Sequence, residues 1–408
     1  MTQEALAGLV GRTRRWLIAV EQDEVDVRVS DLIRLAEALH TRAPDLIADP
    51  MPLRTRRGAI PAPARAGTGG GDDVKRRDFL RFTTTVLAGA SFLDSERLSL
   101  AMERQTGADA RLLDDVATLL EDYNRQFWNV APRLLLPPVR HLLATLRALI
   151  DQTREPALRR RVQSLTGEAA VLAGLLSFRQ DNRGDARGCL ALAEDLAEAA
   201  MDMPLRAHAL AALHSLHSSV PTGGMGGDTR TALAMLDEAS ASAGRHAPPR
   251  LRVWIHAARA EEHAVLGDAA AAHRDLGDAE HALSVSQGPA SGFFEHWNPT
   301  RLAGFRGNCE LLLGRPAEAA NVLQGVLDRT SPELHGPYAC VSADLAAAAA
   351  GQGDVERACD LLGRGLEVAV EAGAGPDGID RIAGIRRRYL PDDSAPVRRL
   401  DEQLLLAR

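Results

Sequence analysis

Residues 260–283, AEEHAVLGDAAAAHRDLGDAEHAL, contain the pattern that decides the fold. Both halves of the stretch are rich in Ala, a residue that loses no side-chain entropy in a helix. Between them stands the pair Gly267-Asp268, where glycine tolerates the backbone geometry that ends a helix. The stretch therefore predicts two helices joined by a tight turn, with small residues where the helices must approach closely.

The same order of helix, glycine turn and helix recurs along the chain. It is found again in NCELLLGRPAEAANVLQGVL (308–327) and DLAAAAAGQGDVERACDLLGRGLEVA (344–369). The turn dipeptides are spaced by 43, 40, 47 and 39 residues and begin at Gly184, Gly227, Gly267, Gly314 and Gly353. A unit of two helices cannot bury its apolar face alone, so consecutive units are expected to stack.

This repeat resembles the tetratricopeptide (TPR) repeat, although its period is longer than the roughly 34 residues usual in that family. The resemblance implies a TPR-like solenoid, an α-α superhelix with a concave surface that binds peptides or partner helices. A generic helical bundle is the alternative. The composition also favours an all-α fold, because aromatic residues make up only 4% of a chain that is 45% hydrophobic.

Charge and targeting signals exclude several classes of protein. The net charge of −7 gives no overall attraction to nucleic acid, and the basic excess is confined to residues 51–81. No run approaches the ~18 apolar residues of a membrane span, and the N-terminus lacks a secretory signal. The four cysteines lie far apart without zinc-type spacing, which predicts reduced, buried thiols rather than a metal site. We therefore expect a cytoplasmic protein.

The first residues predict a second structural unit. In TQEALAGLVGRTRRWLIAVEQ (2–22), Gly11 separates two short helical segments, and Thr13 can cap the second. Arg14 and Arg15 then stand exposed at the start of that second helix. Two short helices in this arrangement are the geometry that places side chains in the major groove of DNA.

This stretch, together with SDLIRLAEAL (30–39), resembles the lambda-repressor-like, xenobiotic-response-element (XRE) class of helix-turn-helix domains. The resemblance implies that Gln3 bonds a phosphate or base edge and that Thr13 caps its helix and touches phosphate. It also implies that Arg14 and Arg15 read bases, with guanine as the natural target. Ile18 occupies a position that often carries a polar reader in that class. The family's first helix is absent before Thr2, so the expected domain is truncated.

The chain divides into four expected segments. Residues 1–48 form the helix-turn-helix domain, and residues 49–74, rich in Pro, Gly and Ala, form a flexible linker. Residues 75–100 begin with KRRDFLR, which resembles a twin-arginine export signal, and are interpreted as a junction helix. Residues 101–408 form the TPR-like domain. An exported repeat protein is the alternative if the twin-arginine motif is real.

No catalytic motif accompanies these segments. His214 and His217 stand three residues apart with Ser215 and Ser218 nearby, but no HExxH, GxSxG or Walker-type loop is present. The Gly-rich residues 222–228 lack a lysine and a preceding strand, so they are interpreted as a loop between repeats. We expect no catalytic residue, no metal and no cofactor.

The concave surface of the repeats is the expected ligand site. Its candidate residues are polar and aromatic side chains of the inner helices: Arg252, Trp254, Asn298, Arg301, Asn308 and Tyr338, with Arg179, Asn182 and His256 as further candidates. The densest aromatic cluster, Phe293-Phe294 with His296-Trp297, is expected either to gate a pocket or to fasten a long loop.

The sequence therefore predicts a transcriptional regulator that binds double-stranded operator DNA. The resemblance implies that it acts as a homodimer and that its repeats sense a peptide or small-molecule effector. The alternative is a TPR-like protein-interaction scaffold that does not bind DNA.

Overall fold

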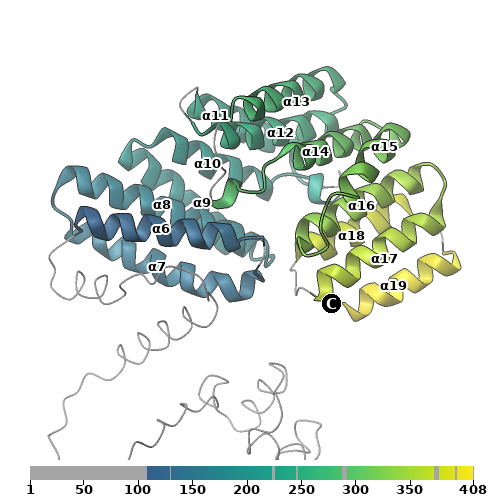
Figure 1. Ribbon diagram of the computed structural model, residues 1–408, viewed down its shortest axis with the longest axis horizontal. Coiled ribbons are helices and arrows are strands. Elements are labelled where there is room, and N and C mark those ends of the chain that lie inside the picture. Colours follow the sequence, from purple (N-terminus) through teal and green to yellow (C-terminus); the bar gives the residue numbers. More distant parts are fainter. Residues whose placement is uncertain are drawn as a thin grey trace, which may run out of the picture. The chain divides into compact units, whose positions relative to one another are not determined.

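The computed structural model describes residues 108–128, 130–222, 226–244, 247–286, 292–371, 376–390 and 393–407. These residues form fourteen α-helices and three short 3-10 helices and contain no strand, which confirms the all-α prediction (Figure 1). The predicted helix-turn-helix, linker and junction helix, together with Gln3, Thr13, Arg14, Arg15 and Ile18, lie outside the described residues.

Most helices follow one another with short connections. Their bounds are α6 Ala110–Gln126, α7 Pro132–Gln152, α8 Pro156–Phe178, α9 Arg183–Ala200, α10 Met203–Leu213, α11 Thr229–Ala243, α12 Pro249–Val265, α13 Ala269–Ser284, α14 Pro299–Leu312, α15 Pro316–Leu327, α16 His335–Gly351, α17 Val355–Glu371, α18 Pro376–Tyr389 and α19 Ala395–Leu406. The 3-10 helices are η2 His214–Leu216, η3 Val220–Thr222 and η4 Gly292–Phe294.

Successive helices pack as pairs, and the pairs stack. Helix α8 packs on α9, α12 on α13, α14 on α15 and α16 on α17 (Figure 1). The first helix of one pair also contacts the first helix of the next: α12 contacts α14, α14 contacts α16, and α16 contacts α18. Consecutive packing of this kind is an α-α superhelix of the TPR type, as the repeat pattern predicted.

Four of the five predicted turns form at the predicted residues. At Gly267 and Gly353 the backbone is left-handed, with φ of 78° and 85°, and such φ values favour glycine. The aspartate after each glycine caps the next helix: Asp268 accepts from the Ala271 N–H at 2.9 Å, and Asp354 from the Arg357 N–H at 3.1 Å.

The fifth prediction, a turn at Gly184-Asp185, is wrong by a few residues. Both residues lie in the first turn of α9, and the left-handed residue is Asp181, with φ of 56°. Asn182 then caps α9 by accepting from the Asp185 N–H at 3.2 Å. Aspartate and asparagine tolerate left-handed geometry better than most residues, so the turn forms without glycine.

Two inserted segments account for the longest spacings between turns. Residues 214–228 connect α10 to α11, and residues 285–298 connect α13 to α14. They fall within the two longest spacings between turns, 43 and 47 residues. Both segments fold back against the helices: η4 packs on α6, and η3 packs on α12 and α18. They therefore connect repeats that are distant in the sequence.

Small residues set the spacing of the stacked helices. A Cβ atom on Gly174 of α8 would lie 2.6 Å from Leu190 Cγ of α9, and one on Gly307 of α14 would lie 2.6 Å from Leu323 Cγ of α15. Both distances are too short for a real contact, so the close approach requires glycine.

Among the described residues, no helix has the length and apolar character needed to cross a bilayer.

Candidate functional site

A cavity of about 400 Å³ opens among the first helices of the repeat pairs. Helices α8, α12, α14, α16 and α18 contribute to its walls, as do the end of α6 and both inserted segments. The volume lies within the range of roughly 300–1,000 Å³ that holds small organic ligands. The inserted segments thus convert part of the open surface of a superhelix into a pocket.

Aromatic side chains form much of the cavity wall. They come from four different parts of the chain: Phe127, Trp128, Phe178, Trp254, Phe293, Trp297 and Phe305. Phe293, on the second inserted segment, is central, with its ring centroid 5.1 Å from that of Phe127 and 5.4 Å from that of Trp254. All three tryptophans of the described residues line this one cavity. Such a wall suits an apolar or aromatic ligand body.

Arg301, in the first turn of α14, lies between two tryptophans of the wall. Its guanidinium carbon is 4.5 Å from the ring centroid of Trp128 and 4.8 Å from that of Trp297. Burial lowers the pKa of Arg301 to about 10, which still leaves the group protonated at neutral pH. Among the described residues no carboxylate forms an ion pair with it.

Arg179, at the end of α8, is a second guanidinium in the wall and is 5% exposed. It donates to the carbonyl oxygen of Phe127, and its guanidinium carbon lies 4.9 Å from the Phe127 ring centroid and 5.6 Å from that of Trp128. Arg179 therefore fixes the end of α6 against α8 and adds positive charge beside Trp128.

Arg381, from α18, is a third guanidinium in the wall, and it is paired. Its Nε donates to Asp344 Oδ1 of α16 at 2.8 Å, and one terminal nitrogen lies 2.5 Å from the same oxygen. The other donates to the carbonyl oxygen of Val220 at 3.0 Å. Burial alone would lower the pKa of Arg381, but Asp344, Cys340 and Glu261 together outweigh it, and the guanidinium stays protonated. This pair ties the first inserted segment to the last repeats.

Glu261 of α12 is the other carboxyl group of the lining. It accepts from Asn308 Nδ2 of α14 at 2.6 Å. Burial raises the pKa of Glu261 to about 8, although Arg381 and the Asn308 hydrogen bond act in the opposite direction. The group is therefore mostly protonated at neutral pH and can donate a hydrogen bond rather than act as a counter-ion.

The histidines beside the cavity are neutral at physiological pH. Burial lowers the pKa of His214 to about 4, against the smaller effect of its bond with the Ala211 carbonyl. Burial also lowers the pKa of His296, whereas nearby Glu295 raises it. The fixed charge of the lining is consequently positive, because guanidinium groups outnumber ionised carboxylates.

Several buried polar atoms of the lining have no hydrogen-bond partner within the described part of the chain. They are Trp128 Nε1, Trp297 Nε1, His296 Nε2 and Arg301 Nε. Native structures pair nearly all buried polar atoms, since an unmet donor costs about 1–3 kcal/mol. A ligand or ordered water in the cavity would supply the missing partners of these four atoms.

The cavity brings together four of the six residues predicted as ligand contacts: Trp254, Asn298, Arg301 and Asn308. Arg252 lies elsewhere, in a smaller hollow of about 250 Å³ beside Gly244. Tyr338 is absent from the lining, although its neighbours Gly336 and Pro337 belong to it. The binding role of all six stays a prediction.

The further candidates separate in the same way. Arg179 lines the main cavity, Asn182 caps α9, and His256 lies in the smaller hollow. The cluster around Phe293 fastens its loop against α6 and also lines the cavity. A gating role stays a prediction.

Four residues of the lining were not among those predicted from the sequence: Trp128, Glu261, Asp344 and Arg381. Tryptophan is scarce in this chain, with four residues in 408, so Trp128 could have been noticed on composition. The three charged residues lie within helical patterns like those around them. Nothing local distinguishes them from solvent-exposed charges, and only their burial in the folded chain does so.

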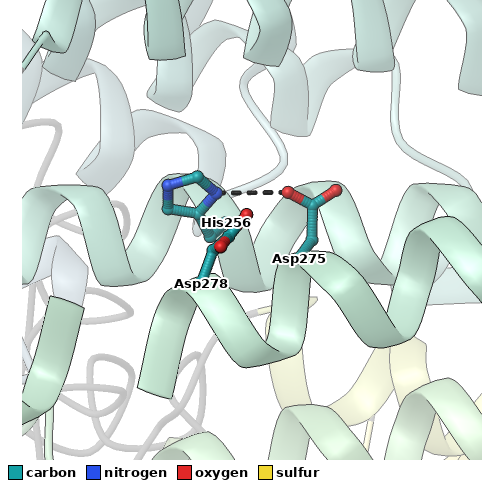
Figure 2. A group of neighbouring side chains, drawn as sticks. All are labelled: His256, Asp275 and Asp278. Carbon is teal, nitrogen blue, oxygen red and sulfur yellow. Dashed lines mark hydrogen bonds and ion pairs between the residues drawn. The ribbon is translucent and has the colours of Figure 1, made fainter. Parts of the chain in front are cut away.

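A cluster of potential metal ligands lies away from the cavity, where His256 of α12 faces Asp275 and Asp278 of α13 (Figure 2). His256 Nδ1 is 3.1 Å from Asp275 Oδ1. Arg259 lies 3.2 Å from the same oxygen, and His263 lies 3.5 Å from the other. Because a guanidinium already neutralises the central carboxylate, we interpret the cluster as an ion-pair network between α12 and α13.

Comparisons with known proteins identify no family. No protein-family model matches the chain, and no curated protein sequence matches it. Among solved structures, the crystal structure of a Rap protein complexed with competence and sporulation factor matches at 15% sequence identity with a TM-score of 0.47. The match covers 82% of this chain and 86% of that chain. A likeness this weak carries no argument about the function of this chain.

Proposed function

We propose that this chain is a ligand-responsive transcriptional regulator. The helical repeats bind a compact organic molecule in the cavity, and residues 1–48 bind operator DNA as part of a homodimer. The observation that carries the ligand half is the cavity itself, which combines an aromatic wall with several unpartnered buried polar atoms. The DNA half rests on the resemblance of residues 2–39 to XRE-class domains. The chain uses no catalytic residue.

The construction of the cavity can couple ligand binding to the arrangement of the repeats. Its walls draw on α6 near the beginning of the described repeats and on α18 near their end. A ligand that contacts both favours the superhelix arrangement in which those elements are correctly spaced. The inserted segments also occupy the surface on which an extended partner would lie. This supports a compact ligand over a scaffold that binds long segments through the same surface.

The ligand half is tested by filling the cavity. Gly304 of α14 lines the cavity, and a Cβ added there would meet nothing closer than Val326 Cγ1 at 3.8 Å. Gly304→Met is therefore expected to fold and to place its side chain in the ligand's space. Gly277→Met on the exposed side of α13 is the matched control, since a Cβ there meets nothing within 4 Å.

The measurement is the fluorescence of the uncharged apolar probe N-phenyl-1-naphthylamine with the full-length chain. We expect Gly304→Met to reduce probe affinity by at least about tenfold and Gly277→Met to leave it unchanged. Equal binding by all three proteins would show that the cavity is not the binding site and would refute the ligand half.

The DNA half is tested by binding of the full chain to a pool of its own upstream DNA across a salt series. Arg14→Ala/Arg15→Ala is expected to abolish selective binding, because base contacts carry specificity and phosphate contacts do not. The contrary outcome is that both proteins bind DNA weakly and equally, and that binding disappears at moderate salt. Only nonspecific attraction of DNA to the basic residues 51–81 would then remain. The scaffold alternative would be preferred in that case.

A further inference from the structure

Two guanidinium groups of the cavity differ in whether a counter-ion pairs with them. Arg381 has its counter-ion in Asp344 and a further acceptor in the Val220 carbonyl. Arg301 has neither within the described residues, and its Nε is a buried donor without a partner. A buried charge is normally paired because desolvation is costly. Arg301 is thus a cation held in place without its anion.

The surroundings of Arg301 orient it for bidentate recognition. The two tryptophans lie within cation-π distance of the guanidinium, at 4.5 and 4.8 Å. Stacking on aromatic rings engages the face of a guanidinium and leaves the N–H groups at its edge. Those edges match the spacing of oxygens on a carboxylate, sulfonate or phosphate.

Two helix N-termini add to the positive potential at this place. Arg301 is the third residue of α14, whose cap Asn298 also lines the cavity. Helix α16 begins at His335 without a side-chain cap, and Leu334 and Gly336 line the cavity at that end. The N-terminal ends of helices carry partial positive charge that favours anions.

Resting on the proposed ligand-binding function, we propose that the cavity recognises compact apolar or aromatic anions, whose anionic group binds Arg301 between Trp128 and Trp297. The aromatic wall that includes Trp254 and Phe293 holds the apolar body. Protonated Glu261 donates to an acceptor elsewhere on the ligand. The cavity volume of about 400 Å³ matches a compact molecule.

The test uses two fluorescent probes that differ by one group. 8-Anilinonaphthalene-1-sulfonate carries a sulfonate, and N-phenyl-1-naphthylamine is the same molecule without it. The full-length protein carries Trp16→Phe, so that energy transfer to the probe comes only from the three cavity tryptophans. We expect the sulfonate to bind at least about tenfold more tightly than the uncharged probe.

Arg301→Gln is expected to remove this preference while leaving the affinity for the uncharged probe within about threefold of the parent protein. Arg306→Gln is the matched control, because Arg306 lies on the same helix but is exposed and pairs with Glu280. Arg301→Lys keeps the charge without the planar fork and is expected to retain part of the preference. It also serves if Arg301→Gln does not fold, since a reduced preference in a folded Lys variant would still locate the anion contact, and an unchanged preference would overturn it.

The outcomes separate the two proposals. If the uncharged probe binds in the cavity but the sulfonate shows no advantage, the anion inference is overturned and the ligand-binding function stands. A preference that survives Arg301→Gln shows that another group binds the anion, which also overturns it. If neither probe binds, the proposed function fails and the inference fails with it.

Competition against the bound sulfonate probe distinguishes two sources of carboxylate. N-acetyltryptophan represents a compact acid, and a hexapeptide ending in tryptophan represents a peptide C-terminus. We expect the compact acid to compete at least as well as the hexapeptide, and its carboxamide to compete about tenfold less well. A hexapeptide that competes about tenfold better would overturn the compact class.

Discussion

Arg381 and Arg301 line the same cavity, and the parts of its wall around them are built differently. At the Arg381 end, Asp344 and the Val220 carbonyl satisfy the guanidinium, so the charge joins α16, α18 and the first inserted segment. At the Arg301 end, two tryptophans hold the guanidinium and no described carboxylate forms an ion pair with it. The first arrangement stabilises the fold. The second leaves an electrostatic interaction to be completed by something outside the chain.

This difference shows why burial of a charge alone does not indicate its role. A buried ion pair destabilises the protein when one partner is removed, because the remaining charge has no counter-ion. When a buried charge has no counter-ion, its substitution breaks no ion pair and leaves no unpaired partner, so the free energy of unfolding changes less. Substitutions at the two ends should therefore change stability by very different amounts.

The largest effect is expected for Asp344→Asn. It leaves Arg381 buried with only the Val220 carbonyl and a neutral amide, which should lower the free energy of unfolding by about 3–5 kcal/mol. Urea denaturation followed by circular dichroism measures the change. The double variant Asp344→Leu/Arg381→Met should recover much of the loss, and a double variant as unstable as the single one would contradict the ion-pair explanation.

A pH-dependent effect is expected from Glu261, which acts electrostatically on both Arg301 and Arg381. Its pKa is about 8 in the folded chain, against the ordinary glutamate value of 4.5. Between these pH values the unfolded chain loses the proton first and so binds fewer protons than the folded chain. Stability therefore falls as pH rises from about 4.5 to 8, by up to about 1.4 kcal/mol per pH unit.

Glu261→Gln should flatten this dependence, because the amide cannot ionise. Urea denaturation at several pH values compares it with the parent chain and with Glu280→Gln, a substitution at an exposed position. Parallel pH profiles for the parent chain and Glu261→Gln would show that burial of Glu261 is not the cause.

A small effect on stability is expected for Arg301→Met without ligand. The loss of two cation-π contacts opposes the gain from removing a desolvated charge. The free energy of unfolding should stay within about 1 kcal/mol of the parent value. A loss of 3 kcal/mol or more, like that at Asp344, would mean that Arg301 supports the fold and that the two ends of the cavity do not differ as described.

The smallest effect is expected for Arg306→Gln, one turn beyond Arg301 on α14. Arg306 and Glu280 are about half exposed, at 45% and 53%. Exposed ion pairs contribute about 0.2–1 kcal/mol, and salt screens them. Thermal denaturation should show that the variant is less stable by about 0.2 kcal/mol, and this difference should disappear at high salt. A larger loss of stability would indicate that Arg306 makes a contact besides its pair with Glu280.

The packing of the inserted segments could not be predicted from the sequence. Spacings of 43 and 47 residues between turns indicated extra residues, but not where those residues lie. In the folded chain they pack against α6, α12 and α18 and close the cavity. Their position depends on partners far away in the sequence, so no local pattern could specify it.

The candidate site was predictable only in part, for the same reason. Trp254, Asn298, Arg301 and Asn308 stood out as polar or aromatic residues on helices that the repeat pattern assigned to the concave surface. Arg252 was chosen on the same grounds and lies in a different hollow. One residue shifts position by about 100° around a helix, so a small difference in helix rotation decides which side chains reach the cavity.

The sequence by itself determined the helices, most of their turns and their stacking order. These depend on local properties: the helix preference of Ala and Leu, glycine at left-handed positions, and Asp or Asn as caps. Only the tertiary structure decided that Trp128, Glu261, Arg301 and Arg381 meet in one cavity, and that one arginine has a counter-ion while the other has none. Pairing and burial of charges depend on the distances between distant segments, and the curvature of the folded superhelix sets those distances.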